Sequence, residues 1–307
     1  MTGSGLILVD KPGGWTSHDV VARVRRLAGT RKVGHAGTLD PMATGLLILG
    51  VNSSTRLLTY IVGADKEYLA TIRLGATTTT DDAEGDVVAE ADPAAVAAVA
   101  DEGIARGIRA LTGEIEQVPS SVSAIKVDGK RAYARVRAGE EVVLQARAVT
   151  IAEFELLAAR RLPDPEAPVA IELDVRVVCS SGTYIRSLAR DLGADLGVGG
   201  HLTALRRTRV GPFDVREAGE LDTLDAAAAL IPAARAASDL FETLELTEQQ
   251  AIDLTHGRRI HIADREGPGG GPVAAIAPGG HLVGLIEFRG KEARTLVNFP
   301  TDEIASA

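Results

Sequence analysis

Residues 34–51 read Gly-His-Ala-Gly-Thr-Leu-Asp-Pro-Met-Ala-Thr-Gly-Leu-Leu-Ile-Leu-Gly-Val, and this stretch decides how the chain is interpreted. Its last six residues, 46–51, are a short apolar run typical of a buried strand. Residues 34–45 form a loop whose three glycines permit sharp turns and the close approach of a ligand. Pro41 fixes the chain after Asp40 and favours an extended backbone at Asp40 itself. The stretch therefore presents one rigidly held carboxylate that can act as a nucleophile or a general base, or it is only a connecting loop.

Segments on both sides of this stretch carry the patterns of helices and strands. The sequence predicts strands at 5–9, 67–74, 123–127, 142–157, 169–179 and 202–210, and helices at 17–29, 53–62, 93–111 and 184–196. Ser17 is expected to cap the first helix, and Gly29 to end it. Beyond about residue 240, short strands and the turn-rich run 267–272 predict a small all-β unit.

The composition is that of an ordinary globular protein of 307 residues, with 45% hydrophobic and 24% charged residues. The chain contains no apolar run long enough to cross a membrane, and the first residues lack the basic start and apolar core of a secretion signal. Cys179 is the only cysteine, so an intramolecular disulfide cannot form. We therefore expect a cytoplasmic protein that does not associate with membranes.

The net charge of −9 conceals an uneven distribution. Acidic residues concentrate in the segments 74–105 and 214–253. Basic residues gather in three clusters: Arg23, Arg25, Arg26, Arg31 and Lys32; Lys126, Lys130, Arg131, Arg135 and Arg137; and Arg186, Arg190, Arg206, Arg207 and Arg209. A polyanion binds to a local positive surface whatever the net charge, so these clusters fit either RNA-binding surfaces or solvated helix faces.

Six segments in chain order carry a resemblance to a known family. They are Lys11-Pro12-Gly13-Gly14-Trp15-Thr16-Ser17, the loop around Asp40, Lys66-Glu67-Tyr68, residues 120–137, residues 180–188 (Ser-Ser-Gly-Thr-Tyr-Ile-Arg-Ser-Leu) and residues 205–211 (Leu-Arg-Arg-Thr-Arg-Val-Gly). In this order they resemble the bacterial TruB-type synthases that form pseudouridine from uridine-55 of tRNA. One such loop would be a weak signal, whereas six in the same order are a strong one.

The resemblance implies a reaction that detaches uracil from C1′ of its ribose, rotates it and rejoins it through C5. Asp40 takes the position of the catalytic nucleophile, with C6 of the base and C1′ of the sugar both open as its target. Arg186 takes the position of the cation that keeps this carboxylate ionised. Tyr68 matches the residue that stacks on the extracted uracil and is a candidate for the final proton transfer.

The resemblance also assigns substrate contacts. Tyr184 falls on a second active-site tyrosine position, and Leu205 would close the apolar side of the base pocket. His35 matches the residue that braces the space left by the flipped base. Lys11 and Gly37 are further candidates for substrate binding. Taken from the residues alone, each of these side chains could instead be structural.

Basic residues of two segments are the candidates for RNA contact. The resemblance places an RNA-gripping insertion at about 118–147. Phosphate contacts are expected from Lys126, Lys130, Arg131, Arg206 and Arg207, and they would make binding salt-dependent.

The implied fold is α+β, with a mixed, largely antiparallel sheet core flanked by helices at 1–239 and a small C-terminal all-β PUA-like RNA-binding domain at 240–307. The scattered histidines form no metal-ligand pattern, and the isomerisation is redox-neutral, so neither metal nor organic cofactor is expected. The implied partner is the TΨC arm of tRNA, and the implied state is a monomer.

Two other functions remain open at this point. One is a catalytically silent tRNA-binding chaperone, against which the presence of Asp40, Tyr68, Tyr184 and Arg186 argues. The other is a phosphoryl-transfer enzyme that uses Asp40 as acceptor, against which the lack of a G-x-x-x-x-G-K-[ST] segment argues. A synthase for another tRNA or rRNA uridine is the nearest alternative within the class.

Overall fold

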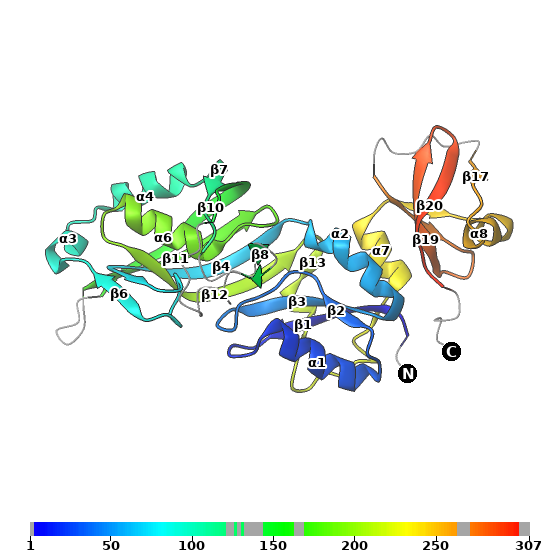
Figure 1. The fold of residues 1–307 in the computed structure, drawn as a ribbon, viewed down its shortest axis with the longest axis horizontal. Helices are drawn as coiled ribbons and strands as arrows, with labels where there is room; N and C mark the ends of the chain where they lie inside the picture. The colour runs from blue at the N-terminus through cyan, green and yellow to red at the C-terminus, as the bar shows by residue number, and fades with distance from the viewer. Residues whose placement is uncertain are drawn as a thin grey trace. The chain divides into compact units, whose positions relative to one another are not determined.

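The computed structural model describes residues 3–120, 126–127, 130–131, 144–162, 169–262 and 271–300. Contacts between Cα atoms divide the chain into two compact units (Figure 1). The first unit comprises Met1–Pro41, Gly45–Val62 and Gly211–Ala307, and the second comprises Met42–Thr44 and Gly63–Val210. The boundary near residue 240 that the sequence suggests stays a prediction.

The first unit is built around β1 (Gly5–Lys11). This strand pairs antiparallel with β3 (Thr44–Val51) and β15 (Ile231–Pro232), and parallel with β14 (Gly219–Glu220). A short strand, β2 (Val33–His35), extends the other edge of β3. Helix α1 (Ser17–Ala28) buries its apolar stripe against β1 and β3, in one hydrophobic core with Leu221 and Leu224.

Helix α1 begins one residue earlier than the sequence suggests. Thr16, and not Ser17, is its N-cap, because Thr16 and Asp19 form a reciprocal capping box. Gly29 ends the helix in a left-handed conformation with φ 65°, as predicted. Because Thr16 caps the helix, the Ser17 hydroxyl is available for a contact with the backbone of Leu39.

The rest of the first unit contains short elements and a second sheet. They are η1 (Asn52–Leu57), α2 (Leu58–Val62), β13 (Phe213–Asp214), η2 (Val215–Glu217) and α7 (Ala233–Leu240), followed by a five-stranded sheet in the order β16 (Thr243–Glu245), β18 (Val273–Ile276), β19 (Leu282–Arg289), β20 (Glu292–Asn298) and β17 (Ile260–His261). This sheet has its own hydrophobic core, to which the helix α8 (Glu248–Thr255) contributes Leu254. The predicted helix at 53–62 is thus a 3-10 segment followed by one short α-helix, and the predicted all-β unit contains one helix.

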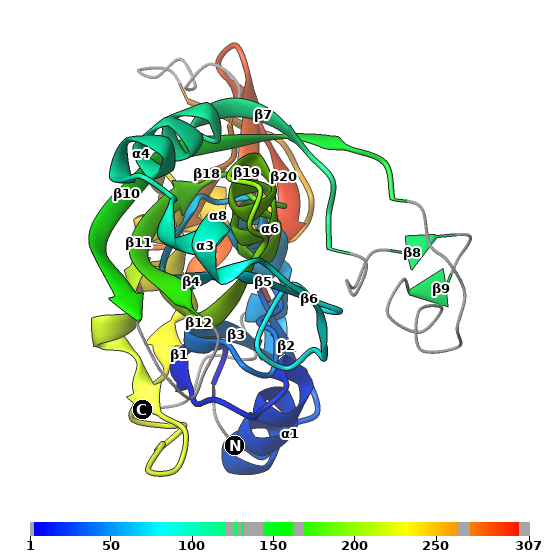
Figure 2. The same cartoon turned by 90° about the vertical axis from the view of Figure 1, so that its left-hand side faces the viewer.

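The second unit is a five-stranded antiparallel sheet with helices. Its strands run in the order β12 (Gly200–Val210), β4 (Lys66–Leu74), β11 (Ala170–Cys179), β10 (Arg147–Leu162) and β7 (Gly113–Gln117). Helix α6 (Ile185–Asp195) packs on β12 and β4, and α4 (Asp101–Ala110) packs on α6 and β10 (Figure 1). The remaining elements are α3 (Pro93–Ala97) and two small hairpins, β5 (Ala76–Thr78) with β6 (Val87–Glu90) and β8 (Lys126–Val127) with β9 (Lys130–Arg131) (Figure 2).

The α+β class with largely antiparallel sheets is therefore confirmed. The helix predicted at 93–111 is wrong as a single element, because Ala100 is extended, with φ −84° and ψ 148°, and separates α3 from α4. None of the described helices has the length and apolar character needed to span a membrane.

Candidate active site

The backbone on both sides of Asp40 is fixed by the N-terminal segment of the first unit. The Ser17 hydroxyl accepts a hydrogen bond from the Leu39 amide at 2.9 Å and donates one to the Leu39 carbonyl at 3.1 Å. The amide of Gly14 donates to the carbonyl of Pro41 at 2.9 Å. The residues directly before and after the carboxylate are thus tied to the first residue of α1 and to the segment that precedes it, which restrains the Asp40 loop.

Lys11 lies inside this arrangement. Its side chain is fully buried, and its amino group donates to the carbonyls of Pro12 (2.9 Å), Trp15 (2.6 Å) and Pro41 (3.2 Å). A buried ammonium group is tolerated when its three N–H donors find acceptors, and these carbonyls supply them. Lys11 therefore holds the loop backbone together.

The other predicted residues of the first unit lie close by in the chain. Gly37 has φ 84°, in the left-handed region that favours glycine, and Gly45 has φ 98° where the loop enters β3. His35 is half-buried at the end of β2, and its ring meets that of His18 edge to face, with ring centres 5.7 Å apart.

In the second unit, three predicted residues share one face of the sheet. Strand register sets Tyr68 of β4 opposite Arg207 of β12, and Leu205 opposite Ala70. Because directly paired residues in a sheet point to the same side, Tyr68, Leu205 and Arg207 lie together on the face that α6 covers. All three are buried, and Arg207 is only 1% exposed.

Two further cations lie on the same two strands, Lys66 on β4 and Arg206 on β12. Burial and the neighbouring Arg207 lower the pKa of Lys66 to about 8. The Lys66 amino group donates to the carbonyl of Ala64 at 2.5 Å. Arg206 is half-buried, and its Nη1 donates to the hydroxyl of Thr44, the first residue of β3, at 3.5 Å.

Arg186 is buried in the first turn of α6. Its side chain is 5% exposed, and Nη1 lies 3.4 Å from Oδ2 of Asp82, whose side chain is 3% exposed. The same nitrogen donates to the carbonyl of Thr80 at 2.8 Å. A guanidinium with a buried carboxylate and a carbonyl as partners is both charged and fixed in orientation.

The loop that supplies Asp82 is itself organised by hydrogen bonds. Oδ1 of Asp82 accepts from the Thr80 hydroxyl at 2.5 Å and from the Glu84 amide at 3.0 Å, and Asp81 adopts a left-handed conformation with φ 60°. Burial raises the pKa of Asp81, which lies 3.5 Å from Arg190. Asp82 lies in the acidic segment 74–105 and is not among the predicted site residues, because the sequence there does not distinguish a buried carboxylate from a solvated one.

Tyr184 is the N-cap of α6, without a side-chain cap of its own. The side chain of Gln117, on β7, takes the place of a capping side chain. Its Oε1 accepts from the Tyr184 amide at 2.8 Å, and its Nε2 donates to the Tyr184 carbonyl at 3.1 Å. Gln117 is 2% exposed. It therefore fixes the start of the helix that carries Arg186, a role that no sequence motif indicated.

The predicted RNA-gripping insertion lies mostly outside the described residues. Its described part includes β8 and β9, whose register sets Lys126 opposite Arg131 and Val127 opposite Lys130. The three predicted basic residues therefore occupy one small hairpin. The predicted strand residues 123–125 fall outside the described part of the chain.

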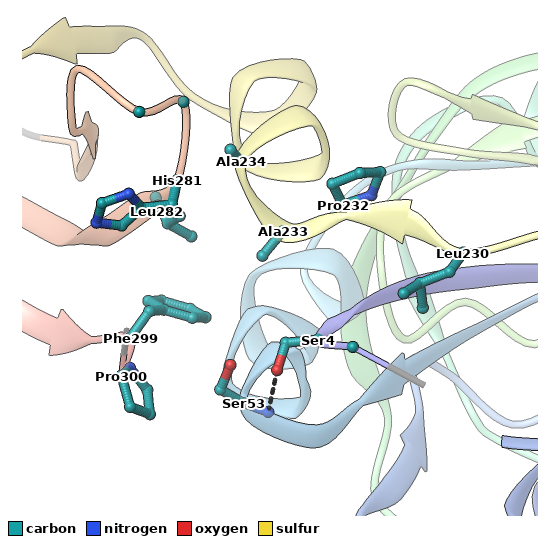
Figure 3. Close-up of a pocket in the computed structure, with 13 residues that line it drawn as sticks. Ser4, Ser53, Leu230, Pro232, Ala233, Ala234, His281, Leu282, Phe299 and Pro300 are labelled. Atoms are coloured by element: carbon teal, nitrogen blue, oxygen red, sulfur yellow. Dashed lines mark hydrogen bonds between the residues drawn. The ribbon is translucent and has the colours of Figure 1, made fainter. Parts of the chain in front are cut away.

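A cavity of about 300 Å³ in the first unit contains none of the predicted site residues. Figure 3 shows Ser4 and Ser53, joined by a hydrogen bond, together with His281, Leu282 and Phe299 around it. Among the described residues, no group of three or more His, Cys, Asp or Glu side chains is placed to hold a metal ion.

Comparison with known proteins identifies the family of the chain. Residues 25–185 match the family described as "TruB family pseudouridylate synthase (N terminal domain)", and residues 241–300 match "tRNA Pseudouridine synthase II, C terminal". Proteins named tRNA pseudouridine synthase B share 78% identity in Leifsonia xyli subsp. xyli (99% of both chains) and 55% in Paenarthrobacter aurescens (96% of this chain, 95% of the relative).

Solved structures of similar fold include a chain of a Cbf5-Nop10-Gar1 complex, with a TM-score of 0.66, 26% identity and coverage of 97% of this chain and 86% of that one. A chain of an archaeal box H/ACA Nop10-Cbf5 complex gives a TM-score of 0.64 and 25% identity, covering 94% and 79%. Family match, identity and fold agree: the chain belongs to the TruB family of pseudouridylate synthases.

Proposed function

We propose that the protein is a tRNA pseudouridine synthase that converts uridine-55 of the TΨC loop to pseudouridine. The observation that carries this proposal is the clamped loop of Asp40: the residues before and after the carboxylate are both hydrogen-bonded to the N-terminal segment. A reaction that proceeds through a side-chain nucleophile benefits from such fixed geometry.

The proposed reaction is an isomerisation with balanced atoms. The N1–C1′ bond breaks and a C5–C1′ bond forms, the C5 proton leaves, and N1 gains a proton. Asp40 adds covalently to C6 of the base or C1′ of the sugar and is released at the end. No electrons are exchanged with a second reactant, so we expect no cofactor.

We propose distinct roles for the other residues. Arg186 keeps Asp40 ionised, and Asp82 fixes the Arg186 guanidinium. Tyr68 stacks on the flipped uracil and Leu205 closes the pocket, which their shared sheet face supports. Tyr184 contacts the substrate from the start of α6, and His35 braces the vacated space in the RNA loop.

Burial changes the roles proposed for two cations. Lys11 is fully buried and bonded to carbonyls, which favours positioning of the loop over contact with substrate; Gly37 supplies the bend of that loop. Arg207, also buried, lies beside Tyr68, which favours a role at the base pocket over contact with surface phosphates. Arg206, Lys126, Lys130 and Arg131 remain the proposed phosphate contacts.

We further propose that the enzyme acts on the TΨC arm as a monomer in the cytoplasm, that residues 1–239 form the catalytic domain, and that residues 240–307 form a PUA-like RNA-binding domain. Opening and refolding the arm would also give it a tRNA-folding activity. Analytical ultracentrifugation with and without tRNA tests the monomer directly.

Tritium release from tRNA transcript labelled with [5-³H]uridine tests the central proposal. We expect release by the wild type in EDTA, none by Asp40→Asn, and pseudouridine mapped to position 55. A wild type that binds tRNA and releases no tritium would instead support the silent chaperone. Tritium release that is lost in EDTA would contradict the expected independence from a metal.

A further inference from the structure

The exposed side of α1 and the loop after it carry arginines that the proposed chemistry does not use. Arg26 and Arg31 are exposed and Arg23 is half-buried. Within the part of the chain that the structure describes, these three guanidinium groups form no ion pair. Arg25, between them, is exposed and donates to the carbonyl of Val33 at 2.9 Å.

These arginines differ from many others in the protein. Carboxylates pair with the exposed arginines at 160, 161, 216, 235, 258, 259 and 294. On α1 the only carboxylate, Asp19, stands four residues before Arg23 and could pair with it. Its Oδ2 is instead committed to the Thr16 amide (3.0 Å) and hydroxyl (2.6 Å). Among the described residues Arg23 and Arg26 are therefore left without an ion pair, in a chain whose net charge is −9.

An aromatic side chain adjoins these arginines. Trp15 and Arg26 line a shallow recess of about 360 Å³ together with Gly14, Asp19 and Ala22. A flat aromatic face beside a guanidinium suits a nucleic acid, because bases or riboses stack on the ring while the cation meets the phosphate.

The recess and the helix are continuous with the catalytic loop. Gly14 and Ser17, which flank Trp15, are the residues whose hydrogen bonds fix the neighbours of Asp40. Arg26 is nine residues beyond Ser17, about 13 Å along the helix axis at 1.5 Å per residue. RNA with its reacting uridine at Asp40 would place flanking phosphates within reach of this surface.

We propose that Trp15, Arg23, Arg26 and Arg31 form an additional RNA-binding surface that holds the backbone of the substrate tRNA beside the reacting nucleotide. This inference rests on the proposed function. It adds a contact separate from Arg206 and the hairpin of β8 and β9.

The test compares two double variants that remove equal charge. Arg26→Gln with Arg31→Gln alters the surface, whereas Arg216→Gln with Arg235→Gln removes two ion-paired arginines elsewhere. We expect the first to weaken tRNA binding about tenfold, to lower the slope of log K against log salt by one to two, and to raise KM more than it lowers kcat. The second should change none of these, and thermal unfolding would confirm that both variants fold.

Trp15 is the only tryptophan, so its emission reports on the surface in the unaltered protein. We expect tRNA to change this emission, with an affinity that falls in the Arg26 and Arg31 variant. Unchanged emission together with unchanged binding and salt slope would overturn the proposal. Loss of binding to phosphatidylserine vesicles with tRNA binding intact would overturn it in favour of a membrane contact. Because binding and tritium release are measured separately, a wild type without activity would contradict the proposed function and leave this binding test valid.

Discussion

Arg186 is buried with Asp82, and each charge depends on the other. Replacing Asp82 by Asn leaves an uncompensated guanidinium, which typically costs about 3–5 kcal/mol. We therefore expect Asp82→Asn to lower the free energy of unfolding by about 3 kcal/mol in urea, and to reduce tritium release because Arg186 is no longer fixed. Asp239→Asn, which opens the exposed pair with Arg235, should cost less than about 1 kcal/mol. Equal stability of the two variants would contradict the assigned role of Asp82.

Lys66 gives the stability a specific pH dependence. Its pKa of about 8 in the folded protein lies below its ordinary 10.5, so above pH 8 the unfolded chain binds more protons and stability rises with pH. Burial raises the pKa of Cys179 to about 11 from 9.0, which has the opposite effect above pH 9. Between pH 8 and 9 we expect a rise of about 1 kcal/mol from Lys66, absent in Lys66→Met. The exposed Lys291→Met is the control, and urea unfolding at pH 7, 8 and 9 gives the measurement; a rise that survives in Lys66→Met would have another source.

At the residue scale, the sequence singles out as candidates the groups that motifs carry, such as Asp40 and Arg186, and it does not point to the residues that contact them in the fold. Asp82 lies in a polar run of threonines and acids, and Gln117 ends an ordinary strand. Their roles depend on burial and on contacts with residues far away in the chain. Asp82 contacts Arg186, 104 positions on, and Gln117 contacts Tyr184, 67 positions on. No local pattern encodes such a partner.

At the scale of elements, a contact between α1 and the loop of Asp40 fixes the backbone next to that carboxylate. Ser17→Ala removes both hydrogen bonds to Leu39 and leaves a buried amide unsatisfied, which typically costs about 1–3 kcal/mol. We expect kcat for tritium release to fall with little change in KM, because the loop and not the RNA surface is altered. Ser54→Ala is a matched control, since this hydroxyl is also fully buried and has no hydrogen-bond partner among the described residues. If both variants kept the wild-type kcat, the Ser17 contact would not position the nucleophile.

Elements with strong periodicity were predicted well, and their ends less well. The buried strand β3 and the apolar face of α1 could both be predicted, because the spacing of hydrophobic residues along the sequence indicates a strand or a helix. The cap of α1 was wrong by one residue, because Thr16 and Ser17 are both good caps and only Thr16 has an acidic residue three positions on. The break at Ala100 was missed because alanine gives no signal to end a helix.

At the scale of the whole molecule, net charge is a poor guide to partners. Acidic side chains of this protein pair with exposed arginines on neighbouring strands, as Glu172 and Asp174 of β11 do with Arg160 of β10. The arginines of α1 that have no ion pair among the described residues then give this surface a local positive potential. Attraction to RNA depends on such a local potential and not on the net charge of −9. Charge pairing in the fold therefore determines which basic clusters of the sequence remain available to a partner.

Two hydrophobic cores in the first unit predict that it does not unfold as one body. Leu47 belongs to the core of α1, β1 and β3, and Leu254 to the core of the C-terminal sheet; both are at most 1% exposed. Either change to alanine should cost about 2–5 kcal/mol. Because each core is separate, we expect Leu254→Ala to increase hydrogen exchange across 243–298 and spare residues 5–51, and Leu47→Ala to do the reverse. Leu254→Ala should also retain the wild-type kcat for tritium release. Exchange that rises equally in both regions for either variant would show that the two cores unfold together.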